Sequence, residues 1–322
     1  MQKIIILINR ISENPTPDEI DVIDQAAVVE KALIGLGYEC EREFIDLNLN
    51  LFYEKYKNNK PELIFNLVES LNNNGGIIHF IPSLLEVMKI PFTGCPADGM
   101  FLTTNKVLTK KILFANNLAT PEWHSAPVKT KLSSEKRYIA KSCNEDASIG
   151  ISDKNVFYSN NPEILEHFSQ IWGDNYFIEE YIEGREFNIS VLGGKTGAQV
   201  LFPAEIIFNN YTGEKPKIIS YEAKWDESSF EYHNTVRTFE FKDSDKPLIK
   251  NLEEICLKCW HVFNLKGYVR VDFRVDKNNR PYILEINPNP CISPDAGFYA
   301  ACKKTGLEFT QVIERIIEDA VL

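Results

Sequence analysis

The stretch Gly267–Pro290, with the sequence GYVRVDFRVDKNNRPYILEINPNP, decides the fold. In its first half apolar residues alternate with charged ones, and this period of two predicts a half-buried strand. A second strand follows, and the two asparagines at the centre of the stretch favour a tight turn between the strands. With these asparagines at the tip of a hairpin, Asp272 faces Glu285 and Arg270 faces Asn287.

The facing carboxylates predict a metal site. The Cβ atoms of Asp272 and Glu285 would lie roughly 5 Å apart, and like charges that close repel unless something neutralises them. Together with the amide oxygen of Asn287 they form a set of hard oxygen donors, which suits a Mg²⁺ ion that bridges phosphates. The alternative is a solvated surface hairpin with ordinary polar residues. Apolar neighbours on both strands, and Pro288 and Pro290 just after them, favour the metal site.

The rest of the chain shows an α/β pattern. Strand and helix patterns alternate through the first hundred residues, and this order is typical of a parallel sheet with helices on both faces. We expect strands over 3–8, 38–45, 62–67, 137–141, 156–158, 176–182, 186–192, 198–208, 267–276 and 280–287. We expect helices over 18–36, with Gly37 as its stop, and over 77–87, 104–118, 162–171, 247–263 and 307–320.

Composition excludes several classes of protein. The chain has 322 residues, 35 Lys and Arg against 46 Asp and Glu, and a formal charge of −11, so nucleic acid and anionic lipid surfaces should repel it. Its seven cysteines are scattered, as expected for free thiols in a reducing compartment. No apolar run is long enough to span a membrane, and the N-terminal run is too short for a signal peptide. We therefore expect a cytoplasmic protein.

Further motifs occur in a fixed order along the chain. They are Ile139–Lys141 followed by Ala147–Gly150, then Phe177–Leu192 with the sequence FIEEYIEGREFNISVL, and then Tyr221–Trp225 with the sequence YEAKW. Together with the hairpin they resemble the ATP-grasp superfamily, and within it the D-alanine–D-alanine ligase family. The resemblance covers essentially the whole chain. It implies a parallel α/β N-terminal domain over 1–103, a small α+β central domain over 104–183, and a larger α+β C-terminal domain with an antiparallel sheet over 184–322.

The resemblance assigns residues to the nucleotide phosphates. Lys106 matches the helix lysine that reaches them, and Lys141 matches the strand lysine that binds the same group. The loop Asp146–Gly150 would close over the phosphates with its backbone N–H groups and the Ser148 hydroxyl. The family usually has glycine at the position of Asp146.

The base and the sugar have their own matches. Glu179 would lie near the exocyclic amine of adenine, and Glu186 would accept hydrogen bonds from the ribose hydroxyls. The backbone of the residues after Glu179 would contact the adenine ring; these are Glu180, Tyr181 and Ile182. On its own this segment favours an acidic surface strand, and the other motifs around it reverse that interpretation.

The resemblance also implies the reaction. Asp272, Glu285 and Asn287 match the magnesium ligands, with Mn²⁺ as a substitute, and Arg270 matches the arginine that steadies a reacting acyl phosphate. Lys224 matches the lysine of a loop beside them. A substrate carboxylate would attack the γ-phosphate of ATP, and an amine would then attack the acyl phosphate to form an amide. The implied partners are small, amino-acid-like carboxylates and amines, and the family also suggests a homodimer.

Departures from the family concern the amino-acid substrates. The family has a glycine-rich first loop ending in Ser-x-Glu, a His-Gly pair after the third strand, a Gly-Met pair and a Ser-His-Ser segment after the metal strand, and a tyrosine after the loop lysine. This chain has Asn9–Asn14, Glu69-Ser70, Cys291-Ile292, Pro294-Asp295-Ala296 and Trp225 at those places. We therefore expect substrates other than D-alanine.

Two other functions stay open at this point. The first is a nucleotide-binding protein that has lost catalysis and acts as a regulator or assembly partner, although such a binder has no need of Arg270. The second is an ATP-grasp phosphotransferase that stops after phosphorylation.

Overall fold

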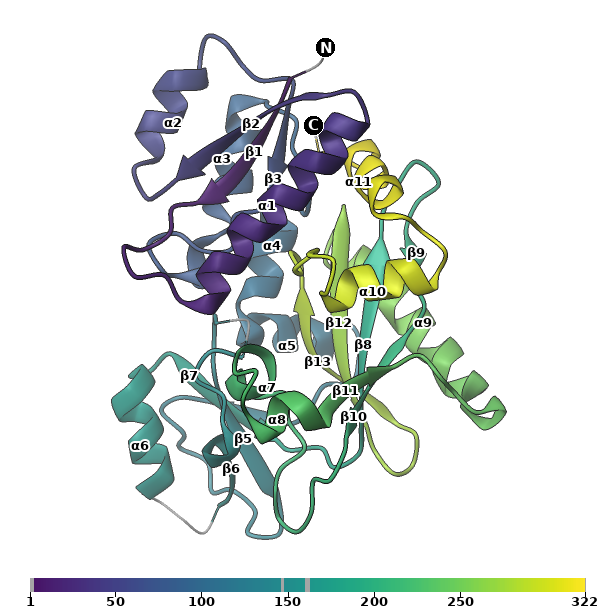
Figure 1. Ribbon diagram of the computed structural model, residues 1–322. Coiled ribbons are helices and arrows are strands. Elements are labelled where there is room, and N and C mark those ends of the chain that lie inside the picture. The colour runs from purple at the N-terminus through teal and green to yellow at the C-terminus, as the bar shows by residue number, and fades with distance from the viewer. Residues whose placement is uncertain (1–2, 146–147, 160–162, 322) are drawn as a thin grey trace.

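The computed structural model describes residues 3–145, 148–159 and 163–321, which form three β-sheets. Figure 1 shows a parallel sheet at the top, a six-stranded sheet in the middle and a four-stranded sheet at the lower left. Each sheet lies within one of the three predicted ranges. The predicted division into domains remains a proposal. Leu113 and Leu118 belong to the predicted central range, yet they pack in the core beneath the six-stranded sheet of the C-terminal range.

The parallel sheet has the order β2-β1-β3 and is covered on both faces, as its pattern predicts. Its strands are β1 (Lys3–Asn9), β2 (Glu39–Ile45) and β3 (Leu63–Asn66). Alternate residues of β1 point to opposite faces, so Ile4, Ile6 and Ile8 pack with α1 (Pro17–Gly35). On the other face Ile5 and Leu7 pack with α2 (Leu49–Tyr56) and α3 (Phe80–Met88).

Helix α1 begins and ends where its sequence directs. The Glu19 carboxylate accepts a hydrogen bond from the backbone N–H of Thr16 at 3.0 Å, which satisfies a donor that the helix start leaves without a partner. At the other end Gly37 has φ +89°, a conformation that suits glycine. The predicted stop at Gly37 is therefore confirmed.

The four-stranded sheet has the order β4-β7-β5-β6 and is antiparallel. Helix α6 (Glu163–Trp172) covers it through Phe168, which packs with Phe157 and Tyr176. Its strands are β4 (Trp123–Ser125), β5 (Arg137–Ser142), β6 (Val156–Tyr158) and β7 (Tyr176–Glu180).

The six-stranded sheet has one apolar face and one polar face. Its order is β11-β10-β8-β12-β13, with β9 paired to β8. The strands are β8 (Arg185–Leu192), β9 (Gln199–Val200), β10 (Ala204–Phe208), β11 (Thr235–Thr238), β12 (Tyr268–Val275) and β13 (Pro281–Asn287). Val271 and Phe273 pack in one core with residues of α9 (Lys246–Val262), including Cys256. The opposite face bears the charged residues of the strands.

Two groups of predictions are wrong in detail. The single strand expected over 198–208 is divided into β9 and β10, because Pro203 has no N–H for a sheet hydrogen bond. The helix expected from 104 begins at Lys106, after a separate helix over Ala97–Thr104. Helices that we did not predict as such are α2, α4 (Ala97–Thr104), α7 (Tyr221–Trp225), α8 (Phe230–Asn234) and α10 (Gly297–Lys304).

The end of the chain packs against its beginning. Helix α11 (Phe309–Glu318) contributes Val312, Ile313 and Ile316 to the core that contains β1 and α1. Val321 pairs with Phe92 beside the parallel sheet. The N-terminal and C-terminal regions therefore share one continuous apolar core.

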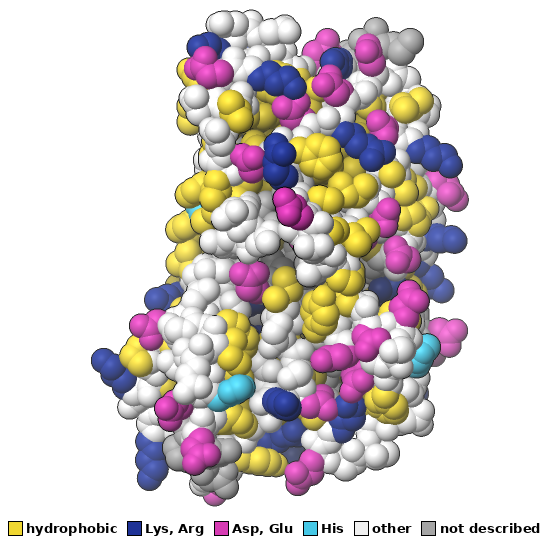
Figure 2. Space-filling model, turned by 60° about the vertical axis from the view of Figure 1, so that its left-hand side comes forward, with side chains coloured by type: hydrophobic (Ala, Val, Ile, Leu, Met, Phe, Trp, Pro, Cys, Tyr) yellow, Lys and Arg dark blue, Asp and Glu magenta, His cyan; other side chains and the backbone are white. Residues whose placement is uncertain are grey.

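The surface is mixed in charge. On the face shown in Figure 2 acidic and basic side chains are interspersed, and apolar side chains reach the surface between them. Within residues 3–145, 148–159 and 163–321, none of the helices combines the length and the apolar character needed to cross a bilayer.

Gly184 precedes β8, and the backbone there lies very close to β12. A substitution at this glycine can test that contact. Gly184 has φ +152°, and a Cβ atom there would lie 2.0 Å from the carbonyl oxygen of Val275. Gly184→Ala should lower the free energy of unfolding by more than about 1 kcal/mol, because the backbone must move. Gly35→Ala is the control, since nothing lies within 4 Å of its Cβ position. Equal stability of the two variants in urea denaturation would contradict the close approach.

Candidate active site

Two adjoining pockets lie beside the polar face of the six-stranded sheet. We call them the inner pocket and the outer pocket. The inner pocket has a volume of about 100 Å³, and every predicted site residue except Asn287 lines it. The predicted residues among its lining are Lys106, Lys141, Ser148, Glu179, Glu180, Tyr181, Ile182, Glu186, Lys224, Arg270, Asp272 and Glu285.

The outer pocket is much larger, with a volume of about 1160 Å³. It is lined by α1, the segment after β3, the short helices α7 and α8, β11 and the segment after β13. Asn287 lies here. Lys224, Arg270 and Glu285 line both pockets and therefore mark the place where the two meet.

Strand register places the charged residues in rows on the pocket side. Strand β12 pairs antiparallel with β8 on one side and with β13 on the other. The predicted pairs Asp272 with Glu285, and Arg270 with Asn287, are both present. Across the three strands the rows are Ser190, Arg270 and Asn287; Asn188, Asp272 and Glu285; and Glu186, Arg274 and Tyr282.

The hairpin reaches this register by a route that we did not predict. The backbone N–H of Asp276 bonds to the carbonyl of Arg280, so the turn is shifted by one position from the one centred on the two asparagines. Next to the tip, Val275 therefore pairs with Pro281. A bulge between Asp272 and Phe273 then restores the predicted pairing at the site, because one extra residue on β13 compensates for the shift.

Asp272 and Glu285 do not face each other as two bare charges. Arg270 donates two hydrogen bonds to the Asp272 carboxylate, from Nε to Oδ1 and from Nη2 to Oδ2, both at 2.7 Å. Asn188 donates a third at 2.8 Å. The repulsion that the sequence suggested is therefore offset in this structure, because the positive charge of the Arg270 guanidinium lies against the Asp272 carboxylate.

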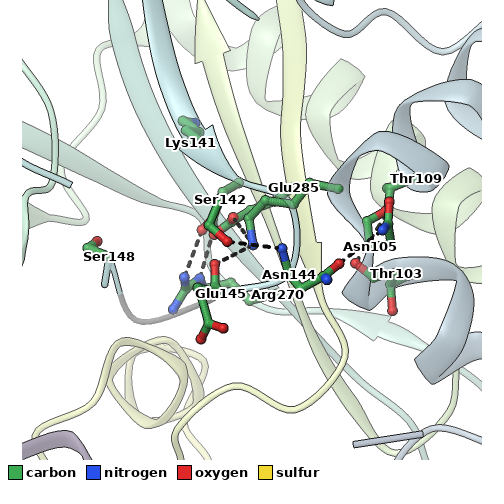
Figure 3. Close-up of polar contacts among 12 residues, drawn as sticks. Thr103, Asn105, Thr109, Lys141, Ser142, Asn144, Glu145, Ser148, Arg270 and Glu285 are labelled. Carbon is green, nitrogen blue, oxygen red and sulfur yellow. Dashed lines mark hydrogen bonds and ion pairs between the residues drawn. The ribbon is translucent and has the colours of Figure 1, made fainter. Parts of the chain in front are cut away.

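Cations surround Glu285. The Lys106 ammonium lies 3.4 Å from its carboxylate and donates to the backbone carbonyl of Glu145 at 2.8 Å. Burial by itself would raise the pKa of Glu285, but Lys106, Lys141, Arg270 and Lys224 outweigh it and lower the pKa to about 2. Figure 3 shows Glu285 beside Glu145 and Arg270, across from the helix that bears Thr109.

Glu179 of β7 is fully buried and forms ion pairs with two lysines. Its carboxylate is 2.5 Å from the ammonium of Lys110 and 2.7 Å from that of Lys141. Burial opposes the charge on Glu179, but the two lysines prevail and lower its pKa. Lys110 in turn donates to the Thr120 hydroxyl at 2.7 Å. Glu179 therefore stays ionised and holds Lys141 against the wall of the inner pocket.

The remaining predicted residues occupy the same wall. Glu186 pairs with Arg274 at 3.2 Å, although its burial raises its pKa above the ordinary value. Glu180 pairs with Lys136 at 2.8 Å. The hydroxyl of Tyr181 accepts from the backbone N–H of Lys217 at 2.8 Å.

The loop predicted to close over the phosphates is described only in part. The Ser148 hydroxyl donates to the carbonyl of Ile219 at 2.8 Å, and Ser148 has φ +60°. Asp146, where the sequence departs from the family, lies outside the described residues. Lys224 projects from helix α7, whose start is capped by the Ser220 side chain.

The donor set on the hairpin fits Mg²⁺ by its chemistry. Asp272, Glu285 and Asn287 offer carboxylate and amide oxygens from neighbouring positions of one hairpin, and hard cations prefer such oxygens. The Asn287 oxygen also accepts from the backbone N–H of Asn289 at 2.9 Å. The described residues contain no group of three or more His, Cys, Asp and Glu side chains arranged to hold a metal, as expected for a set of two carboxylates and one amide.

The departures from the family gather in the outer pocket. Residues at these places that line it are Asn9, Glu69, Ser70, Trp225, Cys291, Asp295 and Ala296. Asp21 and Glu69 form part of its wall and are linked by the buried Gln25, which donates to both carboxylates. Arg10 is exposed and pairs with Asp46 instead.

Sequence reasoning missed several residues of the site that a simple period would have found. Lys110 comes four residues after Lys106, so it lies on the same face of α5 (Lys106–Ala115). Asn188 comes two residues after Glu186, and Arg274 comes two after Asp272, so each shares a strand face with a predicted residue. Arg237 had no sequence signal, because it lies on a short strand outside every motif.

A family model described as D-ala D-ala ligase C-terminus matches residues 116–318. The D-alanine–D-alanine ligase of Rickettsia canadensis (strain McKiel) is 30% identical over 298 residues, which are 91% of this chain and 77% of that protein. The chain belongs to the D-alanine–D-alanine ligase family. A second member, from Aquifex aeolicus (strain VF5), is 27% identical over 293 residues, 90% of this chain and 92% of that protein.

Solved structures of this ligase family confirm the predicted fold. The D-alanine–D-alanine ligase from Bacillus anthracis complexed with ATP has a TM-score of 0.74 at 18% identity, covering 99% of this chain and 97% of that one. A second structure of the Bacillus anthracis ligase has a TM-score of 0.76 at 20% identity, with the same coverage. The fold is ATP-grasp, and the chain is an ATP-dependent ligase that forms carbon–nitrogen bonds and ADP.

Lys110 and Lys111 form a matched pair of variants for the buried cluster. Lys110 is fully buried beside Glu179, whereas Lys111 is exposed on the same helix. Lys110→Met should lower the free energy of unfolding by about 3–5 kcal/mol, because Glu179 loses a buried counter-charge. Lys111→Met should change it by less than about 0.5 kcal/mol. Urea denaturation measures both, and a small effect at Lys110 would contradict the role of the cluster.

The lowered pKa of Glu285 predicts how the free energy of unfolding depends on pH. Its folded pKa of about 2 lies below the ordinary 4.5, so its ionised form contributes stability above pH 4.5 that is lost as the pH falls toward 2. Glu285→Gln lacks this contribution, so its free energy of unfolding should fall less steeply with acidification than that of the wild type. The exposed Glu254→Gln is the control and should follow the wild type. Parallel curves for the wild type and Glu285→Gln would show that the cations do not lower this pKa.

Proposed function

We propose that this ligase joins a carboxylate to an amine through an acyl-phosphate intermediate, with Mg²⁺ bound, and that D-alanine is not its preferred substrate. The observation that supports this most directly is the junction of the two pockets. Lys224, Arg270 and Glu285 line both, so a phosphate in the inner pocket and a carboxylate in the outer pocket would meet at these side chains.

The inner pocket has positively charged side chains suited to the phosphates of a nucleoside triphosphate. Lys106 and Lys141 present ammonium groups for the phosphates, and Ser148 presents a hydroxyl from the segment beside them. Glu179 would accept from the adenine amine, and Glu186 from the ribose hydroxyls. The nucleotide would lie between the proposed central range 104–183 and the proposed C-terminal range 184–322, whose strands both line this pocket.

Phosphoryl transfer makes demands that the junction meets. The substrate carboxylate attacks the γ-phosphate, and ADP leaves. The acyl phosphate that forms has phosphate as its leaving group, which the amine then displaces. Arg270 and Lys224 hold the charge of the acyl phosphate while the amine attacks. Bound to Asp272, Glu285 and Asn287, Mg²⁺ would screen the phosphate charges. The Arg270 guanidinium is kept in place by two hydrogen bonds to Asp272, so its position is fixed before the substrate arrives.

The lining of the outer pocket supports substrates other than D-alanine. Glu69, Asp295 and Ala296 stand at places where the family keeps its amino-acid contacts, and none of them reproduces the family side chain. A buried carboxylate or ammonium that loses its partner binds far more weakly.

Release of ADP across a panel of amino acids and small carboxylates tests this function. We expect ADP formation that requires both a carboxylate and an amine, with an amide product found by mass spectrometry. Efficient dipeptide formation at sub-millimolar D-alanine would contradict the substrate proposal but not the ligase reaction. A phosphorylated carboxylate with no amide in the presence of any amine would contradict amide formation.

The binding of ATP to a Lys141 variant tests the proposed phosphate site without any need for turnover. Lys141→Ala should weaken the binding of ATP by about 1.5–3 kcal/mol, the usual loss for a charge-assisted hydrogen bond. Lys136→Ala is the control, because Lys136 pairs with Glu180 but does not line the inner pocket. Both variants are titrated with ATP by calorimetry after their folding has been verified. Wild-type affinity in Lys141→Ala would contradict the phosphate role.

A further inference from the structure

Arg237 is a cation that lines the outer pocket. It lies on β11, at the edge of the six-stranded sheet, and its side chain is exposed to the solvent in the pocket. Across residues 3–145, 148–159 and 163–321, the structure gives the side chain of Arg237 no hydrogen bond and no ion pair, although its backbone pairs with Ile206 in the sheet. The other two arginines among the residues that line the pockets are paired with carboxylates, Arg270 with Asp272 and Arg274 with Glu186.

The guanidinium of Arg237 lies over the start of α10. A Cβ atom added at Gly297 would be 3.2 Å from its Nη2 atom, so the absence of a side chain at Gly297 makes room for the guanidinium. The segment just before this glycine is Pro294-Asp295-Ala296, which has neither hydroxyl of the Ser-His-Ser segment that the family uses for its second carboxylate. Arg237 therefore stands over the place where those contacts are missing.

The charges around Arg237 favour an anionic ligand. Partial burial lowers its pKa, and so does the positive charge of Arg270, while Asp295 acts in the opposite direction. Arg237 and Arg270 line the same pocket, so their positive charges repel, and an anion between them would relieve the repulsion. A guanidinium with free N–H groups also matches the two oxygens of a carboxylate.

The pocket also has residues that suit the opposite charge. Asp21 accepts hydrogen bonds from Gln25, from the Cys291 thiol at 3.0 Å and from the Ser293 hydroxyl at 3.1 Å, all of which are neutral donors. Glu69 accepts from the same Gln25. The outer pocket thus combines a carboxylate pair from the N-terminal region with guanidinium groups from the six-stranded sheet.

We propose that Arg237 binds the free carboxylate of the amine substrate and so makes a terminal carboxylate a requirement for that substrate. The inference rests on the ligase function proposed above and adds a residue that determines specificity. Arg237 acts in place of the missing hydroxyls of the segment 294–296. Substrates whose carboxylate is blocked as an amide lose this contact.

Binding of product-like probes tests the assignment without turnover. Glycylglycine and glycylglycinamide differ only in the terminal carboxylate, and calorimetric titration in the presence of ADP compares them. In the wild type glycylglycine should bind at least about tenfold more tightly, as expected for a charge-assisted contact. In Arg237→Gln this preference should fall below about twofold, while the affinity for ATP stays unchanged.

Two control variants separate this role from a general effect of charge. Arg280→Gln removes the same charge at the hairpin tip, where Arg280 lies over Tyr282 outside both pockets, and it should keep the wild-type preference. Asp295→Asn removes the nearby anion that competes for the guanidinium, so glycylglycine should bind as tightly or more tightly.

The results distinguish this proposal from the ligase function. A preference for glycylglycine that persists in Arg237→Gln, or a wild type that fails to prefer it, overturns the role of Arg237. A preference that depends on Arg237 in a protein that forms no amide would instead uphold the binding role and contradict the proposed reaction.

Discussion

The pairing of β12 with a strand on each side is the constraint on which the rest of the site depends. Because β12 is central, its odd-numbered residues Val271 and Phe273 are fixed in the core, and the charged residues between them must face the pockets. A shift of one residue in either register would turn the carboxylates into the core, at a large cost in solvation free energy. The apolar face under α9 therefore determines the position of the charges on the other face.

Ion pairs between charged side chains then fix the positions of the lysines and arginines that line the inner pocket. Glu179 holds Lys141 and Lys110, Glu285 lies among four cations, and Asp272 holds Arg270. Each buried ion has an opposite charge close by, which is the condition under which burial is tolerated. An incoming phosphate would share these lysines with carboxylates that already fix their positions, so little rearrangement of the cations is required.

The sequence predicted much of this arrangement, and its failures have physical causes. Alternation along Gly267–Pro290 determined the strand faces and hence the pairing of Asp272 with Glu285. The turn was misplaced because the residues at the tip suit more than one loop length, and only the bulge shows which one is used. Short helices such as α7 and α8 are five residues long, too short for a helical period to be visible.

Contacts between distant segments were beyond prediction for a different reason. The fold and the parallel sheet follow from local patterns, whereas the cluster of Glu179 with Lys110 depends on how α5 packs against β7. Arg237 is a clearer case, because its meaning depends on a glycine sixty residues away that leaves room for its guanidinium. Neither residue belongs to a motif, and only the three-dimensional structure brings each one beside its partner.

The two pockets differ in how much freedom their walls allow. Strands β7, β8, β12 and β13 supply most of the charged groups of the inner pocket, and strand pairing fixes the backbone positions from which those side chains project. The outer pocket is lined largely by segments after strands and by short helices, where side chains can change at little cost to the core. The departures at Glu69, Trp225 and Ala296 all fall in the outer pocket. A ligase built in this way can keep one arrangement of charges for the nucleotide while its amino-acid contacts change independently.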